Sequence, residues 1–592
     1  MKLKKVLAVA SAAAVAATMS LGAVGCSNDG GSSVDATPKN TDEYIIPQDY
    51  CRTYYEVFVR SFADGNGDGI GDLRGLADNL DYLNDGDDST TTDLGINGIW
   101  MMPINASPSY HKYDVSDYYA IDDEYGTMED LEYLVAECNK RGIWLQMDLV
   151  LNHTSSDHPW FKEAVLEAQK GLEPESSRAM SRYNFALSKT RPNDVHASAW
   201  REVPGAPDYW YFANFSTDMP DLKLDNKEVQ EEIKKIVDFW LGKGIRSFRL
   251  DAVPSAFGRS DVASYSDKNG EFWTWFNDYC HEKGAEVFAK DGDEIGAYCY
   301  NVGEVWTSDS NTINQYFGTG MSNFNYSVAN SDTSGFGGAV NDGKKAAIFV
   351  ERMQELQVGA IEADKNAILS NFLSNHDNNR SGEQIFGSKP SKIKRGAGLY
   401  LLMPGSPYIY YGEEIGAKGS GRDENKRLAF NWGDKRTVKN PASANYDEKQ
   451  KLGSVKSQTN DANSVLTYYR NAIKLRNRFP EIGRGAMTAY ALNKDGELVV
   501  ASDISSTLSD DESLYGVNKV NGVIAAYTLK WKDREVLIVH NLGDVKASFK
   551  ATAFSDYEIV ATLKADGGSV SFANGVFNMS GGTVAVLKVK AA

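Results

Sequence analysis

The chain has 592 residues, of which 42% are hydrophobic and 11% aromatic, so it can bury a large core and is too long for one compact domain. Its 81 acidic and 62 basic residues give a formal net charge of −19, which repels polyphosphate and disfavours a nucleic-acid partner. The mixed composition, with 53 glycines, excludes low-complexity and fibrous classes.

The first residues have the layout of an export signal. Lysines near the N-terminus precede an apolar run over residues 6–24, which is too short and too rich in alanine for a permanent membrane span. The run leads into Ala-Val-Gly-Cys ending at Cys26, which resembles the lipobox of bacterial lipoproteins. We therefore predict a signal peptide over residues 1–25, lipidation of Cys26 and a flexible tether over residues 26–45. The protein would be exported and anchored to the bacterial membrane; an ordinary signal peptide with a chance cysteine is the alternative.

Short apolar strands alternate with helical patterns through most of the chain, which indicates parallel strands joined by helical crossovers. The third strand, for example, follows a helical pattern over residues 128–139 that is closed by Lys-Arg-Gly. The predicted fold class is α/β, a (β/α)8 barrel. Its eight expected strands cover residues 54–60, 98–102, 143–149, 247–250, 298–302, 323–328, 368–373 and 407–411.

Two parts of the chain depart from this alternation of strands and helices. Residues 153–218 contain five prolines and several aromatic residues, and are predicted to form a small domain inserted after the third strand, with aromatic side chains along one wall of a cleft. After about residue 480, alternating strands such as 523–529, 535–540 and 583–589 indicate a C-terminal antiparallel β-sandwich. The expected domains are the barrel over residues 46–152 and 219–485, the insertion over 153–218 and the sandwich over 486–592.

Polar residues gather just after several expected strands, where a parallel barrel builds its active site. The fourth, fifth and seventh strands each place one carboxylate there, and Asp251, Glu304 and Asp377 can therefore point into one pocket. Glycoside hydrolysis requires an acid that protonates the leaving oxygen and a carboxylate that attacks or stabilises an oxocarbenium-like centre. The three carboxylates can supply both functions.

The neighbours of these carboxylates favour different roles for two of them. Arg249 lies two residues before Asp251 on the same face of its strand, where its guanidinium can keep Asp251 ionised and orient it as a nucleophile. Partial burial beside Trp306 and nearby carboxylates would raise the pKa of Glu304 and keep it protonated as the acid.

These motifs carry a resemblance to a known family. Residues 148–153, 248–252, 303–306 and 374–377 resemble, in this order, the four signature regions of the α-amylase family, family 13 of the glycoside hydrolases. Supporting stretches lie at 95–104, 219–222 and 405–416, so the resemblance extends from near residue 50 to the C-terminus. It implies a (β/α)8 barrel with an inserted second domain and a β-sandwich third domain. It also implies a retaining double displacement on α-glucosidic bonds.

The resemblance implies roles for individual residues. Asp251 matches the nucleophile, Glu304 the general acid/base, and Asp377 the carboxylate that binds ring hydroxyls and favours sugar distortion. Tyr113 matches an aromatic residue that stacks on the sugar in the cleavage subsite. The residues expected to bind substrate are Tyr113, Asp114, His153, Arg249, His376, Trp306 and Arg380.

Residues 64–72, Asp-Gly-Asn-Gly-Asp-Gly-Ile-Gly-Asp, have oxygen ligands at alternate positions separated by glycine, as a hard cation requires. An EF-hand is excluded, because its twelfth position would be Gly75 instead of glutamate. The resemblance implies a structural calcium loop found after the first barrel strand in one branch of the family; an unmetallated turn is the alternative. No organic cofactor is expected. The expected calcium ligands are Asp64, Asn66, Asp68, the Ile70 carbonyl and Asp72.

Several positions depart from the family pattern. Many α-amylases carry Lys and His after the nucleophile motif, where this chain has Pro254 and Ser255, so leaving-side contacts must come from elsewhere and a residue that often helps to hold a second calcium is absent. Ala252 resembles the α-1,4-acting members, and Tyr110 stands where exo-acting α-glucosidases usually carry an Asp that grips the nonreducing end. Both favour cleavage within α-1,4-linked chains.

The leading hypothesis is therefore a retaining, endo-acting α-amylase that hydrolyses internal α-1,4 bonds of starch and maltooligosaccharides. Residues 219–222 (Met-Pro-Asp-Leu) resemble the signature of neopullulanase-like and intermediate branches, so a neopullulanase- or cyclomaltodextrinase-like hydrolase, or a 4-α-glucanotransferase, stays open. A noncatalytic starch-binding protein is a third hypothesis, against which the presence of all three carboxylates counts. The extra N-terminal domain of the dimeric cyclodextrin-cleaving enzymes is missing, so a monomer is expected.

Overall fold

The computed structural model describes residue 49 and residues 51–193, 197–257, 265–289, 299–329, 336–341, 345–446, 452–504 and 522–590. The expected signal peptide, Cys26 and the tether lie outside the described residues, so the lipid anchor stays a prediction. Among the helices in these ranges, none combines the length and the apolar character needed to cross a membrane.

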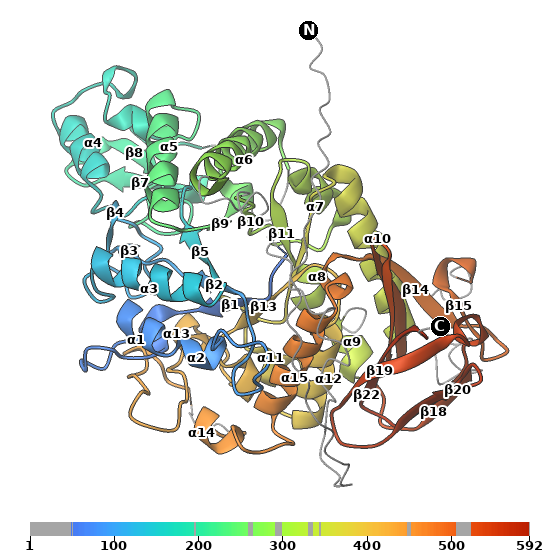
Figure 1. Ribbon diagram of the computed structural model, residues 1–592. Coiled ribbons are helices and arrows are strands. Elements are labelled where there is room, and N and C mark those ends of the chain that lie inside the picture. Colours follow the sequence, from blue (N-terminus) through green and yellow to red (C-terminus); the bar gives the residue numbers. More distant parts are fainter. Residues whose placement is uncertain are drawn as a thin grey trace. The chain divides into compact units, whose positions relative to one another are not determined.

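Eight parallel strands close into a barrel (Figure 1). They are β1 (Tyr54–Val57), β2 (Gly98–Met101), β5 (Trp144–Leu149), β9 (Ser247–Leu250), β10 (Val302–Gly303), β11 (Ser322–Asn325), β12 (Leu369–Phe372) and β13 (Ser406–Tyr410). Around the barrel the order is β1, β13, β12, β11, β10, β9, β5 and β2. The prediction of a (β/α)8 barrel is confirmed.

Helices connect the strands and pack outside them (Figure 1). Along α5, Val229, Ile233, Ile236 and Trp240 are buried at the i, i+4, i+7 and i+11 spacing that places them on one face of a helix. The helices are α1 (Leu73–Asp78), α2 (Leu80–Leu83), α3 (Met128–Lys140), α4 (Pro159–Gln169), α5 (Lys227–Gly242), α6 (Asp267–Phe288), α7 (Ser310–Phe317), α8 (Tyr326–Ala329), α9 (Phe336–Asn341), α10 (Ala346–Ala363), α11 (Ser381–Gln384), α12 (Pro390–Leu401), α13 (Asp423–Lys426), α14 (Val455–Gln458), α15 (Val465–Arg478) and α16 (Glu481–Arg484).

Three barrel strands differ from their expected bounds by three or more residues at one end. The first ends at Val57, because Val59–Ser61 forms a 3-10 turn in which the Ser61 N–H bonds to the Phe58 carbonyl. The sixth ends at Asn325, and α8 begins at the next residue, Tyr326. The fifth is only two residues long, so the apolar run that predicted it is mostly outside the strand and Glu304 follows the strand directly.

Aromatic side chains fill the barrel interior. Tyr54, Trp100, Phe324 and Tyr408 form one buried cluster with Phe372, and the rings of Tyr54 and Tyr408 stack 4.6 Å apart. Because side chains alternate along a strand, the next inward positions toward the carboxyl ends of β1, β5 and β9 are polar. These positions hold Glu56, Asp148 and Arg249, all fully or almost fully buried.

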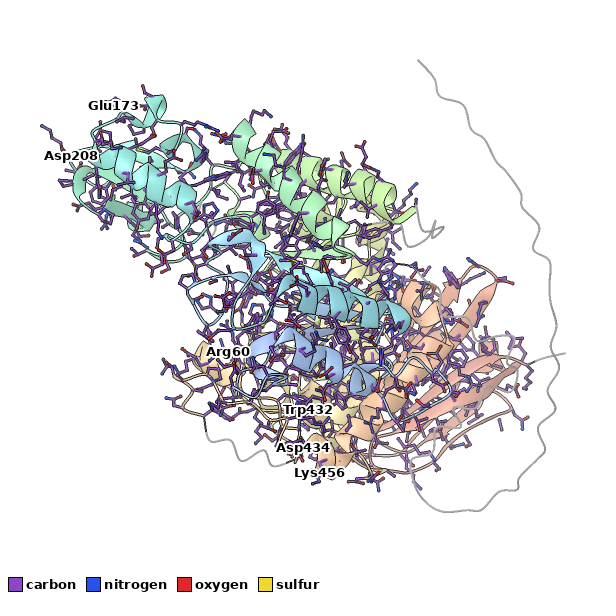
Figure 2. The ribbon with its side chains drawn as sticks, turned by 60° about the vertical axis from the view of Figure 1, so that its left-hand side comes forward. Arg60, Glu173, Asp208, Trp432, Asp434 and Lys456 are labelled. Carbon is purple, nitrogen blue, oxygen red and sulfur yellow. The ribbon has the colours of Figure 1, made fainter. Side chains whose placement is uncertain are left out.

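The segment between β5 and α5 contains α4 and a three-stranded antiparallel sheet in the order β6, β8, β7. The strands are β6 (Phe185–Leu187), β7 (Trp200–Val203) and β8 (Ala206–Phe212). In Figure 2, Glu173 and Asp208 of this segment lie well away from Trp432, which follows β13. A short hairpin of β3 (Asn105–Ala106) and β4 (Asp117–Ile121) precedes α3.

The C-terminal part is a sandwich of two antiparallel sheets, as predicted. The larger sheet has the order β15, β14, β16, β17, β22, β19 and the smaller one β18, β21, β20. Leu537 and Leu587 of the larger sheet share one buried cluster with Phe549 and Phe577 of the smaller sheet. The strands are β14 (Ala486–Leu492), β15 (Leu498–Val500), β16 (Ile524–Trp531), β17 (Arg534–Asn541), β18 (Ala547–Lys550), β19 (Tyr557–Lys564), β20 (Val570–Ala573), β21 (Val576–Met579) and β22 (Thr583–Val589).

Candidate active site

A cleft of about 630 Å³ lies at the carboxyl ends of the barrel strands; we call it the catalytic cleft. The structure brings Asp251, Glu304 and Asp377 together in its lining, although they follow three different strands. The full lining is His111, Tyr113, His153, Phe215, Ser216, Met219, Asp251, Ala252, Pro254, Ser255, Glu304, Trp306, Asp377, Asp423 and Arg427.

The guanidinium of Arg249 contacts the carboxylates of Asp148, Asp251 and Glu304. Its Nη1 donates hydrogen bonds to Asp251 Oδ1 at 2.7 Å and to Asp148 Oδ1 at 3.0 Å, and its Nη2 lies 2.8 Å from Glu304 Oε2. Burial would lower the pKa of Arg249, but the charges of Asp148 and Glu304 outweigh burial and hold the pKa well above its ordinary value. A permanent cation therefore orients Asp251, and one guanidinium fixes the position of Asp251 relative to Glu304.

Glu304 is in a setting that favours its protonated form. Burial raises the pKa of Glu304, and the nearby charges of Asp251 and Asp377 also raise it, against an opposing effect from Arg249. Its Oε2 accepts a hydrogen bond from the backbone N–H of Ala252 at 3.1 Å. Ala252 adopts a left-handed conformation with φ of 48°, which is strained for a residue with a side chain and directs this N–H at Glu304.

Asp377 belongs to a buried chain of charges. His376 Nε2 lies 3.0 Å from Asp377 Oδ2, His376 Nδ1 lies 2.8 Å from Glu56 Oε1, and Arg427 Nη2 donates to Asp377 Oδ1 at 2.9 Å. Burial lowers the pKa of His376, but Asp377 and Glu56 outweigh it and raise the pKa to about 9. Burial would raise the pKa of Asp377, but His376 and Arg427 hold it below its ordinary value. Asp377 is therefore held as an anion whose oxygens can accept hydrogen bonds.

The charge on His376 predicts how stability depends on pH. Its pKa of about 9 in the folded protein lies above its ordinary value of 6.5, so its stabilising contribution is full below pH 6.5 and is lost as pH rises through 9. We expect the free energy of unfolding to fall by up to about 3 kcal/mol over this window, relative to a His376→Gln variant. Urea unfolding of both proteins across the window measures this difference; parallel curves would contradict the assignment.

Three other expected substrate-binding residues line the catalytic cleft. The Tyr113 ring lies against His376 with 5.3 Å between centroids, and its hydroxyl donates to Asp148 at 3.0 Å. His153 Nε2 is buried and has no hydrogen-bond partner of normal geometry among the described residues, which leaves it available to a sugar hydroxyl. Trp306 is 51% exposed at the rim.

The other expected substrate-binding residues lie outside the cleft lining: Arg249 and His376 contact the carboxylates as described above, and Asp114 and Arg380 contact neighbouring loops. Asp114 is buried and accepts hydrogen bonds from the hydroxyls of Ser107 and Ser109, so it stabilises the turn that carries Tyr113. The buried Arg380 donates through Nε and Nη1 to the backbone carbonyls of Lys426 and Tyr411. Both residues fix loops around the site, and their direct contact with substrate stays a prediction.

Several residues of the site were not identified from the sequence. Arg427 and Asp423 lie in a run of mixed charges that has the composition of a solvated turn, and Phe215 lies in the irregular insertion. Glu56 offered a signal: a carboxylate in a strand that is otherwise apolar and aromatic has to meet a partner on the inward face, and here it meets His376.

The loop expected to bind calcium, residues 64–72, is held together by its own side chains. Asp64 accepts hydrogen bonds from three backbone N–H groups of the loop, and Asn66 and Asp68 each accept one. Within the described residues, no three His, Cys, Asp or Glu side chains converge as a set of metal ligands. The donor chemistry still suits a hard cation, because a carboxylate oxygen that accepts one hydrogen bond keeps a second lone pair.

A buried acid, an oriented carboxylate and an anionic acceptor for hydroxyls at the carboxyl end of a (β/α)8 barrel define a glycoside hydrolase. The family model described as "Alpha amylase, catalytic domain" matches residues 56–485. The chain therefore belongs to the α-amylase family, family 13 of the glycoside hydrolases.

Individual relatives agree with this assignment. The chain is 34% identical over 502 residues to Alpha-amylase 3 of Dictyoglomus thermophilum, covering 84% of this chain and 85% of the relative. Maltase A1 of Drosophila melanogaster is 30% identical over 396 residues, covering 61% of this chain and 64% of the relative. Among solved structures, Eubacterium rectale Amy13B superposes with a TM-score of 0.78 at 32% identity, covering 92% of this chain and 97% of that one.

Proposed function

We propose that this glycoside hydrolase is a retaining, endo-acting α-amylase that cleaves internal α-1,4 bonds of starch and maltooligosaccharides. The observation that carries the mechanism is the contact of one guanidinium, that of Arg249, with both Asp251 and Glu304. Asp251 attacks the anomeric carbon and forms a glycosyl ester, while Glu304 gives its proton to the departing oxygen. Glu304 then takes a proton from water, whose oxygen attacks the same carbon and releases Asp251 with retention of configuration.

Tyr110 supports the endo preference. Arg427 Nη1 donates to the Tyr110 hydroxyl at 3.0 Å, and burial raises the pKa of Tyr110 to about 12, so a neutral phenol stands at this position. The resemblance to the family places an Asp there in exo-acting α-glucosidases. Without that carboxylate, the cleft has no acidic group at this position to bind the nonreducing end of the glucan. A glucan chain can therefore continue past this position.

The second candidate is a neopullulanase-like hydrolase or a glucan transferase with the same carboxylates. Met219 of the Met-Pro-Asp-Leu stretch lines the catalytic cleft, which supports a role of this stretch in the choice of substrate. The two candidates share the first displacement and differ in whether water or a sugar hydroxyl accepts the glycosyl group.

Product analysis separates these functions. On end-labelled maltoheptaose, we expect early products of several intermediate lengths, formed as α-anomers, because cleavage is internal and retaining. Side-by-side digestion of amylose, pullulan and cyclodextrin measures the preference among substrates. Stepwise release of glucose from the nonreducing end would contradict endo action, and products longer than the starting sugar would show transfer.

We also propose that residues 64–72 bind a structural calcium through Asp64, Asn66, Asp68, the Ile70 carbonyl and Asp72. Lys439 Nζ lies 3.0 Å from the Asp68 carbonyl oxygen, so its positive charge works against binding of the calcium ion. At a calcium concentration a hundred times the Kd, the folded state gains about 2.7 kcal/mol, so we expect the Tm to rise with calcium and fall with chelator. The Asp68→Asn variant should lose most of this response. Equal Tm values with calcium and with chelator would contradict the site.

We further propose that the enzyme is exported, carries lipid on Cys26 and acts as a monomer outside the cytoplasm. The apolar run before Cys26 and the polar tether after it support this proposal. Detergent-phase partitioning of the parent chain and a Cys26→Ala variant tests it, and equal partitioning of the two would refute the anchor.

A further inference from the structure

A short loop between β12 and α11 carries two residues of the site. It covers residues 374–381 and contains His376 and Asp377; we call it the Asp377 loop. A serine stands at each end, and both Ser374 and Ser381 are buried. The Ser381 backbone N–H donates a hydrogen bond to Ser374 Oγ at 3.2 Å. The two ends of the loop therefore meet at one point.

A single buried carboxyl group contacts both ends of this loop. It belongs to Glu413, the first residue of a 3-10 turn that follows β13. Glu413 Oε1 accepts hydrogen bonds from the hydroxyls of Ser374 at 2.5 Å and of Ser381 at 2.9 Å. β12 and β13 are neighbours in the barrel, so the carboxyl group joins the segments that leave two adjacent strands.

The surroundings of Glu413 favour a neutral carboxyl group. Burial raises the pKa of Glu413 to about 8, against the opposing effect of the hydrogen bonds from Ser374 and Ser381. Its Oε2 is buried and has no hydrogen-bond partner among the described residues, and a charge on such an oxygen would be costly. The carbonyl oxygen of a neutral carboxyl group still has two lone pairs, one for each serine hydroxyl.

The geometry of the site depends on where the Asp377 loop lies. His376 Nδ1 lies 2.8 Å from Glu56 Oε1, which comes from β1, and Arg427 Nη2 donates to Asp377 Oδ1 at 2.9 Å. Both contacts join the middle of the loop to other parts of the chain, so a displaced loop would weaken them together. A misplacement of about 1 Å in a reacting geometry can lower a rate about 10²-fold.

We propose that Glu413 is a positioning residue for the reaction, which clamps both ends of the Asp377 loop and thereby holds His376 and Asp377 in place for the substrate. The inference rests on the proposed function, with Asp377 binding hydroxyls of the sugar ring. Glu413 is not among the residues that line the catalytic cleft. Its effect reaches the sugar only through the loop.

Replacing the clamp should lower turnover more than substrate binding. In Glu413→Ala, we expect kcat for the release of reducing ends from maltoheptaose to fall about 10- to 100-fold, with a smaller change in KM, because contacts to the sugar ring strengthen in the transition state. Glu413→Gln should keep most of kcat, since its amide oxygen can accept both serine hydroxyls. Reducing ends report cleavage at any bond, so this assay does not depend on endo action.

The neighbouring Glu414 provides the matched control. It is also buried in the turn after β13, but its Oε1 accepts hydrogen bonds from the hydroxyls of Tyr55 and Tyr82, outside the Asp377 loop. Glu413→Ala and Glu414→Ala should both lower the Tm, because each leaves two buried hydroxyls without their partner. Only Glu413→Ala should lower kcat per folded molecule, measured well below the Tm of each variant.

The titration of His376 reports the position of the loop directly. Asp377 and Glu56 raise its pKa to about 9 in the parent, against burial. In Glu413→Ala this pKa should fall toward the ordinary value of 6.5, as the contacts weaken. In Glu413→Gln and Glu414→Ala it should stay near that of the parent. NMR of the imidazole signals, assigned with a His376→Gln variant, measures these values.

A lower Tm with unchanged kcat per folded molecule and an unchanged His376 pKa would make Glu413 merely structural and overturn the inference. Equal losses of kcat in Glu413→Ala and Glu414→Ala would do the same. If Glu413→Ala does not fold, Ser374→Ala and Ser381→Ala each remove one donor and should lower kcat roughly threefold or more; unchanged kcat in both would contradict the clamp.

Asp377→Asn separates a failure of the clamp from a failure of the proposed function. We expect this variant to lose at least as much kcat as Glu413→Ala. If Asp377→Asn turns over like the parent, the proposed role of Asp377 fails and the inference fails with it. If Asp377→Asn loses activity while Glu413→Ala does not, the clamp alone is refuted.

Discussion

Glu304→Gln is expected to lower turnover on maltooligosaccharides by about 10²- to 10⁴-fold while the protein stays folded. The amide keeps the shape of the carboxyl group and an oxygen that can accept the Ala252 N–H, which now bonds to Glu304 Oε2 at 3.1 Å. It has no acidic proton to give to the departing sugar oxygen. Steady-state release of reducing ends measures the loss, and a thermal melt checks the fold.

The choice of substrate shows which step the change affects. An activated glycoside, such as an α-maltosyl fluoride, leaves without protonation, so Glu304→Gln should recover much of its first-step rate on this substrate. Glu132→Gln, a change on the exposed face of α3, is the matched control and should leave both substrates unaffected. Turnover of ordinary maltooligosaccharides within tenfold of the parent would refute the acid assignment.

The barrel was predictable because its strands are short apolar runs separated by helical patterns, and the structure closes them in one sheet. The bounds were less predictable where tertiary structure decides them. β10 spans only Val302–Gly303. Its bounds were predicted wrongly because a two-residue strand leaves almost no periodic signal in the sequence. α8 begins at Tyr326, inside the expected sixth strand, where Asn325 Oδ1 accepts the Ser327 N–H and starts the turn.

The three carboxylates were predictable because each follows a strand, and a barrel brings the ends of all its strands together. Arg427 was not, since its position depends on how the long segment after β13 folds back over the cleft, where its Nε bonds to the His376 carbonyl. Such a contact joins residues 51 positions apart and has no local pattern.

Asp114 and Arg380 show a different limit of the sequence pattern. Each lies within a few residues of a residue that lines the cleft. The hydroxyls of Ser107 and Ser109 and the backbone carbonyls of nearby loops bind their polar groups instead. Whether a charged side chain near a motif faces the substrate or a loop carbonyl depends on backbone geometry, which the sequence pattern does not specify.

Asp251→Asn is expected to reduce turnover by at least about 10⁴-fold, because the neutral amide cannot form the glycosyl ester on which both displacements depend. The fold should persist, since Arg249 keeps its buried partner Asp148 and the amide oxygen can still accept a hydrogen bond from Nη1. Stopped-flow kinetics and a thermal melt measure the two effects, and Asp556→Asn, on an exposed carboxylate of the C-terminal sandwich, is the matched control.

The activated glycoside makes this variant differ from Glu304→Gln. A better leaving group replaces the missing acid but cannot replace the missing nucleophile, so Asp251→Asn should show no recovery on α-maltosyl fluoride. In the Glu304→Gln protein, where the second displacement lacks its base, mass spectrometry should detect a glycosyl adduct on the peptide that contains Asp251. Recovery of Asp251→Asn on the fluoride, or an adduct on another residue, would show that the carboxylate held by Arg249 is not the nucleophile. On α-maltosyl fluoride, Glu304→Gln should recover activity and Asp251→Asn should not. This difference assigns the acid and the nucleophile even though both variants lose most of their activity on ordinary maltooligosaccharides.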